Sequence, residues 1–397
     1  MSTRSKRADG LVAVTARAHP PFARGRSVVN AVGLGDEGTR MWGKRDDMVV
    51  HQTEPFNAEP PPAALAGLLT PADAFYSRNH GSIPQIDPST WQLRVDGLVD
   101  RELDLSLADL QERFPPRTEV ATLACAGNRR AALMAVRDIP GQTPWGSAAI
   151  STADWTGVRL ADVLAAAGPA SDAAHIAFTA PDVAQAADPP QPFGGSIPLR
   201  KALSDEVLLA WSMNGQPLPA AHGGPLRVVV PGYIGARSVK WVQSITALAQ
   251  PSDNYFQAVD YRLLPPDADP TRPGQGFALG PVAVTSAILA PDDGASLAAG
   301  PTNVTGYAFA GDGRTVVRVD VSPDGGRTWI QASVDDAAGP WAWQHWHATL
   351  DLAAGHTEIT ARAWDDAGES QPESPASMWN PMGYGNNSWP RARVDIR

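Results

Sequence analysis

The stretch Ala121-Thr122-Leu123-Ala124-Cys125-Ala126-Gly127-Asn128-Arg129-Arg130 contains the only cysteine in a chain of 397 residues. The apolar run 120–124 predicts a strand that ends at a Gly-Asn break. A thiolate binds soft metals or attacks electrophiles, and the two arginines that follow would favour it by lowering the thiol pKa. The arginine pair also suits a planar oxyanion or a phosphate. A lone cysteine is also often inert and buried, so the stretch by itself leaves both interpretations open.

The composition restricts the class of protein. The length indicates two or three domains, and a net charge of −10 argues against non-specific binding to nucleic acid. One cysteine excludes an intrachain disulfide framework and a Cys-rich zinc site. No apolar run approaches the roughly 18 residues that span a bilayer. The segment 1–26 lacks the apolar core of a secretory signal, so we expect a cytoplasmic location, with a periplasmic one left open.

Lysine is scarce in this chain. Of its 32 basic residues, four are lysine: Lys6, Lys44, Lys201 and Lys240. A retained lysine either performs a task that arginine cannot or reflects codon bias, and both explanations stay open.

The chain divides into an extended N-terminal arm (1–53), a mixed α+β domain (54–250), a Pro/Asp/Gly-rich linker (251–280) and an all-β domain (281–397). In the α+β domain, strands are predicted at 91–99, 175–180, 207–213, 226–230 and 239–248. Ser106 and Asp109 form a capping-box start to a short helix, and 159–167 is a second helix. Long irregular pieces at 126–156 and 181–198 suit a cofactor pocket.

Residues 281–397 show a different pattern. Short strands at 282–289, 302–309, 316–322, 328–334, 343–350 and 358–364 alternate with turn sequences. This spacing predicts a β-sandwich that is immunoglobulin-like in size and strand count. In the third strand, Val317, Val319 and Val321 are expected on one face, with Arg318 and Asp320 on the other.

Five motifs, in order along the chain, resemble one family. They are EPFNAEPP (54–61), FYSRNHGSIP (75–84), TLACAGNRR (122–130), AHGGPLRVVVPGYIGARSVKW (221–241) and GYAFAGDGRTVVRVDVSPDGGRTW (306–329). Together they resemble the sulfite oxidase family of molybdenum enzymes, which includes the molybdenum domain of assimilatory nitrate reductase. The resemblance covers roughly residues 54–393. It implies a cofactor domain followed by a β-sandwich dimerisation domain, and hence a homodimer.

The resemblance also implies the site residues. Cys125 matches the thiolate ligand of molybdenum, and a cysteinate suits the sulfur-rich set that a pterin dithiolene supplies. The positions that match contacts to the molybdopterin are Arg78, Asn79, His80, Asp182, His222, Arg227, Ser238, Val239 and Lys240. In the substrate pocket, Tyr261 matches the tyrosine beside the metal, Arg78 and Arg130 match arginines that bind the anion, and Trp145 matches a wall residue.

Three positions depart from the family pattern, and one of them is Arg262, where eukaryotic members usually have lysine. Sulfite oxidases carry the sequence W-N-L-R-G near the C-terminus, whereas this chain has Trp379-Asn380-Pro381-Met382-Gly383. Met382 replaces an arginine, which is the choice of the nitrate reductases. Phe193 replaces a tyrosine.

The resemblance implies oxidation of sulfite to sulfate by oxygen-atom transfer. No haem- or flavin-binding segment is recognised, so electrons would leave to an external acceptor such as a cytochrome or oxygen. Two alternatives stay open: a nitrate or S-oxide reductase that uses the same metal site, and a non-catalytic scaffold that keeps the fold. Molybdenum content distinguishes the scaffold from the enzymes.

Overall fold

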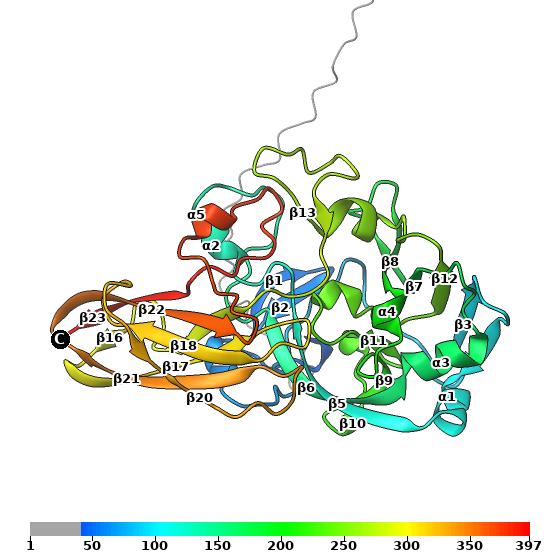
Figure 1. Cartoon of the computed structure of the whole chain (residues 1–397), viewed down its shortest axis with the longest axis horizontal. Helices are drawn as coiled ribbons and strands as arrows, with labels where there is room; N and C mark the ends of the chain where they lie inside the picture. Colours follow the sequence, from blue (N-terminus) through cyan, green and yellow to red (C-terminus); the bar gives the residue numbers. More distant parts are fainter. Residues whose placement is uncertain (1–40) are drawn as a thin grey trace, which may run out of the picture. The chain divides into compact units, whose positions relative to one another are not determined.

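The computed structural model describes residues 41–397, and Figure 1 shows the path of the chain through them. Residues 1–40 of the predicted arm lie outside the described residues. The rest of that arm contains the 3-10 turn η1 (Met41–Gly43) and strand β1 (Val49–Thr53). Strand β1 pairs antiparallel with β2 (Phe56–Glu59), all four residues of which are buried. The arm is therefore attached to the first domain along β2.

The first sheet of the α+β domain has the strand order β4-β3-β12-β7-β8. Strand β12 runs parallel to β3 and antiparallel to β7, so the end of the domain returns to the middle of the sheet. The bounds are β3 Gln92–Gly97, β4 Leu103–Ser106, β7 His175–Ala184, β8 Gln191–Pro198 and β12 Ser244–Leu248. The two predicted helices follow β4 and β6: α1 (Leu107–Arg113), with its Ser106–Asp109 capping box, and α3 (Leu160–Ala167), which ends at Gly168.

The second sheet brings the cysteine strand into the interior. Its order is β10-β9-β6-β5, with β11 paired to β9. The bounds are β5 Pro116–Ala124, β6 Ile150–Arg159, β9 Leu208–Met213, β10 Gln216–Pro217 and β11 Arg227–Val229. The last four residues of β5 are buried, so the strand ends inside the domain, next to Cys125.

Short elements connect the sheets and form much of the site. These are η2 Pro62–Leu65, α2 Arg130–Met134, α4 Leu199–Ala202, η3 Ala220–His222, η4 Gly235–Arg237, the π-helix η5 Phe256–Asp260, β13 Arg262–Leu263, β14 Phe277–Ala278 and α5 Pro375–Met378. Three of them, η5, β13 and β14, lie in the segment 251–280 that was expected to be a linker.

The C-terminal part is a β-sandwich. Its sheets have the orders β15-β17-β21-β20 and β16-β23-β22-β18-β19, and the core between them contains Val304, Trp346, Val319 and Ile359. The bounds are β15 Thr285–Ala290, β16 Ser296–Leu297, β17 Gly300–Phe309, β18 Val316–Ser322, β19 Ile330–Gln331, β20 Ser333–Val334, β21 Gln344–Leu352, β22 Gly355–Asp365 and β23 Arg391–Ile396. Together with the first domain, this confirms the predicted α+β class.

The predicted faces of β18 were wrong at Val317. Its side chain is 56% exposed, whereas Val319 and Val321 are fully buried. The register of β18 against β22 shifts between Val316 and Arg318, so Val316 takes the inward position. A bulge of this kind adds one residue and reverses the alternation before it.

The tail that links α5 to β23 returns to the first domain. The N–H of Gly385 donates to the carbonyl of Ala126 at 2.8 Å, and the guanidinium of Arg129 donates to the carbonyl of Ser388 at 2.5 Å. Helices α2 and α5 consequently lie side by side (Figure 1). The two domains therefore meet next to the Cys125 stretch.

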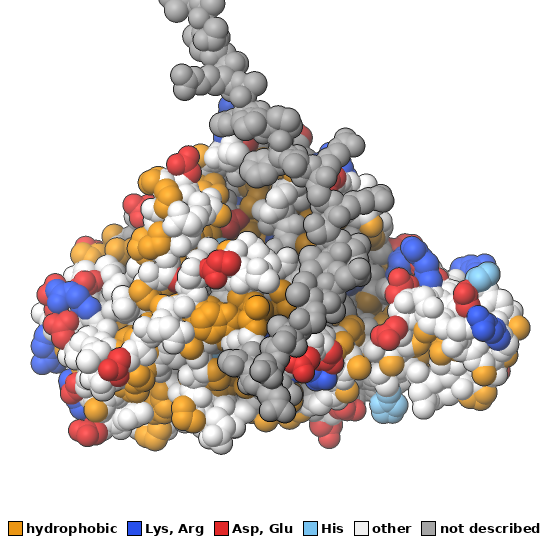
Figure 2. All heavy atoms as spheres, turned by 180° about the vertical axis from the view of Figure 1, so that it is seen from behind, with side chains coloured by type: hydrophobic (Ala, Val, Ile, Leu, Met, Phe, Trp, Pro, Cys, Tyr) orange, Lys and Arg blue, Asp and Glu red, His pale blue; other side chains and the backbone are white. Residues whose placement is uncertain are grey.

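The surface carries charges of both signs. On the face drawn in Figure 2, Lys and Arg side chains alternate with Asp and Glu side chains, and the described residues form no continuous basic area there. Among residues 41–397, no helix is long and apolar enough to cross a bilayer.

Candidate functional site

Cys125 lies where β5 ends against a tight turn. Its N–H donates to the carbonyl of Ala149 at 2.9 Å, and its carbonyl accepts from the N–H of Asn128 at 3.0 Å. The N–H of Gly127 lies 3.4 Å from the sulfur. Burial raises the pKa of the Cys125 thiol, while the charges of Arg130 and Arg78 lower it. Of the two arginines expected to lower this pKa, Arg130 does so and Arg129 does not, and desolvation exceeds the lowering.

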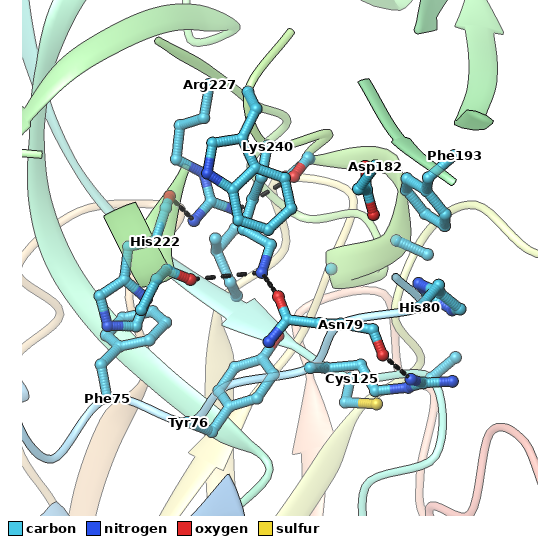
Figure 3. Close-up of a pocket in the computed structure, with 18 of the residues that line it drawn as sticks. Phe75, Tyr76, Asn79, His80, Cys125, Asp182, Phe193, His222, Arg227 and Lys240 are labelled. Carbon is cyan, nitrogen blue, oxygen red and sulfur yellow. Dashed lines mark hydrogen bonds between the residues drawn. The ribbon is translucent and has the colours of Figure 1, made fainter. Parts of the chain in front are cut away.

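The sulfur opens onto a pocket that runs through the first domain (Figure 3). Its walls come from the segment after η2, the end of β5 and the turn after it, strands β7, β8 and β11, the turns η3 and η4, and the segments that follow η4 and η5. The predicted site residues that line it are Arg78, Asn79, His80, Cys125, Asp182, His222, Arg227, Ser238, Lys240 and Tyr261. Segments more than 180 positions apart in the sequence thus share one cavity.

One end of this pocket is rich in buried cations. Lys240 Nζ donates to the side-chain oxygen of Asn79 and, at 3.2 Å, to the carbonyl of Ala221. The guanidinium of Arg227 donates to the carbonyls of His222 at 2.9 Å and Ser238 at 3.0 Å. Burial lowers the pKa of Lys240 well below its usual value and that of Arg227 to about 10. Charges held in this way are costly unless an anion approaches them.

Asp182 faces the same end. Its Oδ1 is buried, and no residue within 41–397 donates a hydrogen bond to it. Burial raises the pKa of Asp182 to about 6, although the charge of Lys240 lowers it. An orphaned acceptor of this kind indicates that a ligand with N–H groups completes the site.

The sulfur end contains a network of aromatic and polar groups. His80 Nε2 lies 2.8 Å from the hydroxyl of Tyr261. The His80 ring is stacked on Phe193 with centroids 4.4 Å apart, and Tyr261 is stacked on Tyr384 at 5.2 Å. Burial raises the pKa of Tyr261 well above its usual value, so its hydroxyl keeps its proton at neutral pH. Phe193, which stands where a tyrosine was expected from the resemblance, contributes ring packing against His80 and no hydroxyl.

Three predicted site residues do not line the pocket. Arg130 donates to the carbonyls of Gly383 at 3.1 Å and Thr143 at 3.0 Å. Trp145 is fully buried in the apolar cluster that contains Cys125, with its ring 4.8 Å from that of His51. Val239 lies in the core, and its carbonyl accepts from the N–H of Val228 at 2.8 Å.

Sequence reasoning missed several residues of the site. Phe75, Tyr76 and Trp241 line the pocket, and all three lie at the ends of motifs quoted above without having been assigned a role. Tyr384 was also missed. Its hydroxyl donates to Asp260 Oδ1 at 2.7 Å, and the Arg130 guanidinium lies 5.0 Å from its ring centre. A signal for Tyr76 was its place in the same motif as Arg78, two residues before it, whereas Tyr384 lies in a loop without periodicity.

Comparison with known proteins agrees with this geometry. Residues 80–256 match the model of the oxidoreductase molybdopterin binding domain, and residues 278–397 match that of the Mo-co oxidoreductase dimerisation domain. The chain is 44% identical over 356 residues to sulfite oxidase of Gallus gallus, covering 86% of this chain and 76% of that protein. The chain belongs to the sulfite oxidase family. The membership of this family that five motifs predicted is confirmed.

Other members of the sulfite oxidase family give further comparisons. Sulfite oxidase of Arabidopsis thaliana is 40% identical, with 89% of this chain and 95% of that protein covered. The chain spans 65% of the mitochondrial sulfite oxidase of Mus musculus. Among solved structures, the sulfane dehydrogenase SoxCD from Paracoccus pantotrophus superposes with a TM-score of 0.74 at 27% identity, covering 88% of each chain.

The residues present fit the molybdenum cofactor of this family. In residues 41–397, no group of three His, Cys, Asp or Glu side chains could hold a metal ion. Cys125 offers one thiolate, which suits the sulfur-rich set that a pterin dithiolene would supply. The cations at the far end suit a phosphate, and Asp182 suits the N–H groups of a pterin. At Gly223, φ is +105° and a Cβ would lie 2.9 Å from Lys240 Cβ, so glycine lets this turn pack directly against the lysine that lines the pocket.

Proposed function

We propose that this protein oxidises sulfite to sulfate at a molybdenum centre held by Cys125, and passes the electrons to an external acceptor such as a cytochrome or oxygen. One observation carries the proposal. In this member of the sulfite oxidase family, a single pocket is lined by the buried thiol of Cys125 and by the cations Arg227 and Lys240. The bound cofactor supplies a metal that exchanges an oxygen atom and two electrons with the substrate.

The residues at the sulfur end would bind and orient the anion. Arg78 lines the pocket beside Cys125 and attracts sulfite by its charge. Tyr261, protonated at neutral pH, offers its hydroxyl as a donor to a substrate oxygen, while His80 at 2.8 Å holds that hydroxyl in place. Because the walls are buried, little water competes with these contacts, and each hydrogen bond to the anion is stronger than in bulk solvent.

Arg130 and Trp145 act from outside the pocket lining in this proposal. The Arg130 charge lowers the pKa of the Cys125 thiol, which favours the thiolate that a metal requires. Trp145 fills the cluster behind Cys125 and fixes the position of the sulfur. Val239 would contribute only its backbone to the cofactor site.

A substrate panel tests the proposal. Molybdenum-loaded protein is expected to reduce an artificial acceptor with sulfite far faster than it oxidises a reduced viologen with nitrate. The Cys125→Ser variant is expected to fold and to lose nearly all turnover. Wild-type-like turnover in that variant, or absence of molybdenum from protein made in a host with the cofactor, would overturn the assignment and favour the scaffold alternative.

The second candidate is reduction of nitrate or an S-oxide. Met382 is the observation that favours it, because this buried side chain carries no charge where sulfite oxidases have arginine. Faster turnover with nitrate than with sulfite in the same panel would select this candidate.

We also propose that the β-sandwich domain (281–397) forms a homodimer, with residues 54–250 as the catalytic domain and 251–280 connecting them. The match of residues 278–397 to a dimerisation domain supports this proposal. Sedimentation equilibrium should give twice the chain mass of 41.9 kDa. The cytoplasmic location stays a prediction, which cell fractionation can check.

A further inference from the structure

Lys44, one of the few lysines of this chain, is buried behind the pocket and makes three polar contacts. The side chain is 3% exposed although it comes from the segment that the sequence assigned to an extended arm. Its Nζ donates to the carbonyls of Ala72 at 2.7 Å and Phe75 at 2.6 Å. The third contact, also at 2.6 Å, is with Nε2 of His222.

The hydrogen-bond inventory of an ammonium group determines the direction of this third contact. An ammonium has three donors and no acceptor, so the two carbonyls and His222 Nε2 use all three of its protons. Nε2 must then accept, which places the proton of a neutral His222 on Nδ1. The carbonyl of Ala72 also lies 3.2 Å from Nε2 and accepts from Lys44 at 2.7 Å; in the assigned tautomer Nε2 has no proton to donate to it.

The charge balance of the pair agrees with this assignment. Burial lowers the pKa of Lys44 to about 7, while the charge of Asp73 raises it. Burial lowers the pKa of His222 well below its usual value, and the cations Lys44, Lys240 and Arg227 lower it further. Below pH 7 the charge therefore belongs to Lys44, and the imidazole is neutral.

The His222 ring has a second nitrogen, Nδ1, which Lys44 does not contact. The ring lines the pocket and packs edge-on against Phe75 with centroids 5.2 Å apart, as Figure 3 shows for these two labelled residues. Within residues 41–397, Nδ1 has no hydrogen-bond partner. The neighbouring groups that line this part of the pocket are Arg227 and Lys240, which are also donors.

We propose that Lys44 is a positioning residue for the cofactor. Its ammonium holds the Nε2 lone pair of His222, so that the imidazole offers an Nδ1–H donor to the anionic end of the phosphorylated pterin. The proposal rests on the cofactor assignment made above, but the tautomer of His222 can be measured without it. It also explains why a lysine stands here: a compact ammonium satisfies three acceptors around one atom, whereas a planar guanidinium cannot.

Nitrogen NMR of histidine-labelled protein tests the tautomer directly. At about pH 6, below the Lys44 pKa of about 7, the His222 signals should show a protonated, pyrrole-like Nδ1 and an unprotonated, pyridine-like Nε2. The His222→Gln variant assigns the signals by their loss. A pyrrole-like Nε2 in the wild-type protein would overturn the proposal, because Lys44 would then be the acceptor. This result would leave the proposed function untouched.

A double-mutant cycle tests the positioning role. Lys44→Met should release the cofactor about 10–100-fold faster, the usual effect of removing a group that orients a ligand from behind. In the His222→Gln background the same change should have little further effect, because the two residues act through one contact.

The matched control is Lys201→Met, which also removes a buried lysine. Lys201 is 8% exposed, pairs with Glu206 and lies outside the pocket lining. Its loss should leave the cofactor release rate unchanged. Equal acceleration by Lys201→Met, or additive effects of Lys44→Met and His222→Gln, would show a general loss of stability and overturn the proposal. Molybdenum and pterin content, measured over time by elemental analysis and pterin fluorescence, is the readout.

Discussion

Tyr384 connects the C-terminal tail to the sulfur end of the pocket through one hydroxyl hydrogen bond and two ring contacts. Its hydroxyl donates to Asp260 Oδ1 at 2.7 Å, and its ring stacks on Tyr261 with an interplanar angle of 21°. The Arg130 guanidinium lies 5.0 Å from the ring centre. Tyr384→Phe removes the hydrogen bond and keeps both ring contacts, so the variant isolates the hydroxyl.

The expected loss follows from the acceptor. Asp260 is 8% exposed, and a hydrogen bond to a charged group contributes about 1.5–3 kcal/mol. Tyr384→Phe should therefore lower the free energy of unfolding by about that amount at pH values above the folded pKa of Asp260, where the carboxylate is charged. The phenyl ring of the variant still fills the space of the tyrosine ring, so lost packing should contribute little to this decrease.

The loss should depend on pH in one direction. Burial raises the pKa of Asp260 in the folded state, and the Tyr384 hydrogen bond opposes that rise. A raised folded pKa means that the folded protein binds the proton more tightly than the unfolded chain, so this group contributes stability at low pH and loses it as pH rises through the folded pKa. The variant raises the pKa further. The difference in unfolding free energy between wild type and variant is therefore largest above the folded pKa of Asp260, and it decreases as the pH falls through that pKa.

Urea denaturation at neutral and acidic pH measures both effects. Tyr255→Phe is the matched control, because within the described residues the Tyr255 hydroxyl makes no hydrogen bond; its cost should stay within about 0.5 kcal/mol. A Tyr384→Phe loss as small as the control's, or one that grows on acidification, would refute the reasoning.

Three further predictions concern the tail and the β-sandwich. Met382→Arg should lower the KM for sulfite about 10–100-fold by restoring one charge-assisted hydrogen bond, and an unchanged KM in steady-state assays would contradict this. Gly383→Ala should destabilise more than Gly368→Ala in urea: both have positive φ, but only at Gly383 would the Cβ meet Arg130 Cγ, at 2.7 Å. Asp320→Asn should lower the free energy of unfolding by about 1.5–3 kcal/mol, because this fully buried carboxylate pairs with two arginines; equal thermal unfolding of variant and wild type would exclude that role.

The strands that the sequence predicted well have apolar periodicity of their own. Strand β18 was expected at 316–322 and occupies those residues, and β5 ends at Ala124 as expected. Strands β6 and β8 lie in pieces expected to be irregular. The β8 sequence contains Pro192, Gly194 and Gly195, which disfavour strands locally. Pairing of β8 with β7 overrides that preference, and pairing is a tertiary property that a local pattern does not contain.

The site residues also divide into those that a local motif predicted and those that depend on tertiary contacts. Arg78, Asn79, His80 and Lys240, which the motifs assigned to the cofactor, all line the pocket, and each lies within a short, characteristic sequence. The pair Arg129–Arg130 was expected to suit an oxyanion, yet both guanidinium groups bind backbone carbonyls of the tail more than 250 positions away. No spacing rule predicts that partner.

The central claim is that the Cys125 sulfur binds molybdenum. X-ray absorption at the molybdenum edge, which counts sulfur neighbours of the metal, tests it most directly on wild-type and Cys125→Ser protein loaded with cofactor. The account predicts one sulfur neighbour fewer in the variant, with the pterin still bound at the cation-rich end. The same sulfur count in both proteins would contradict it.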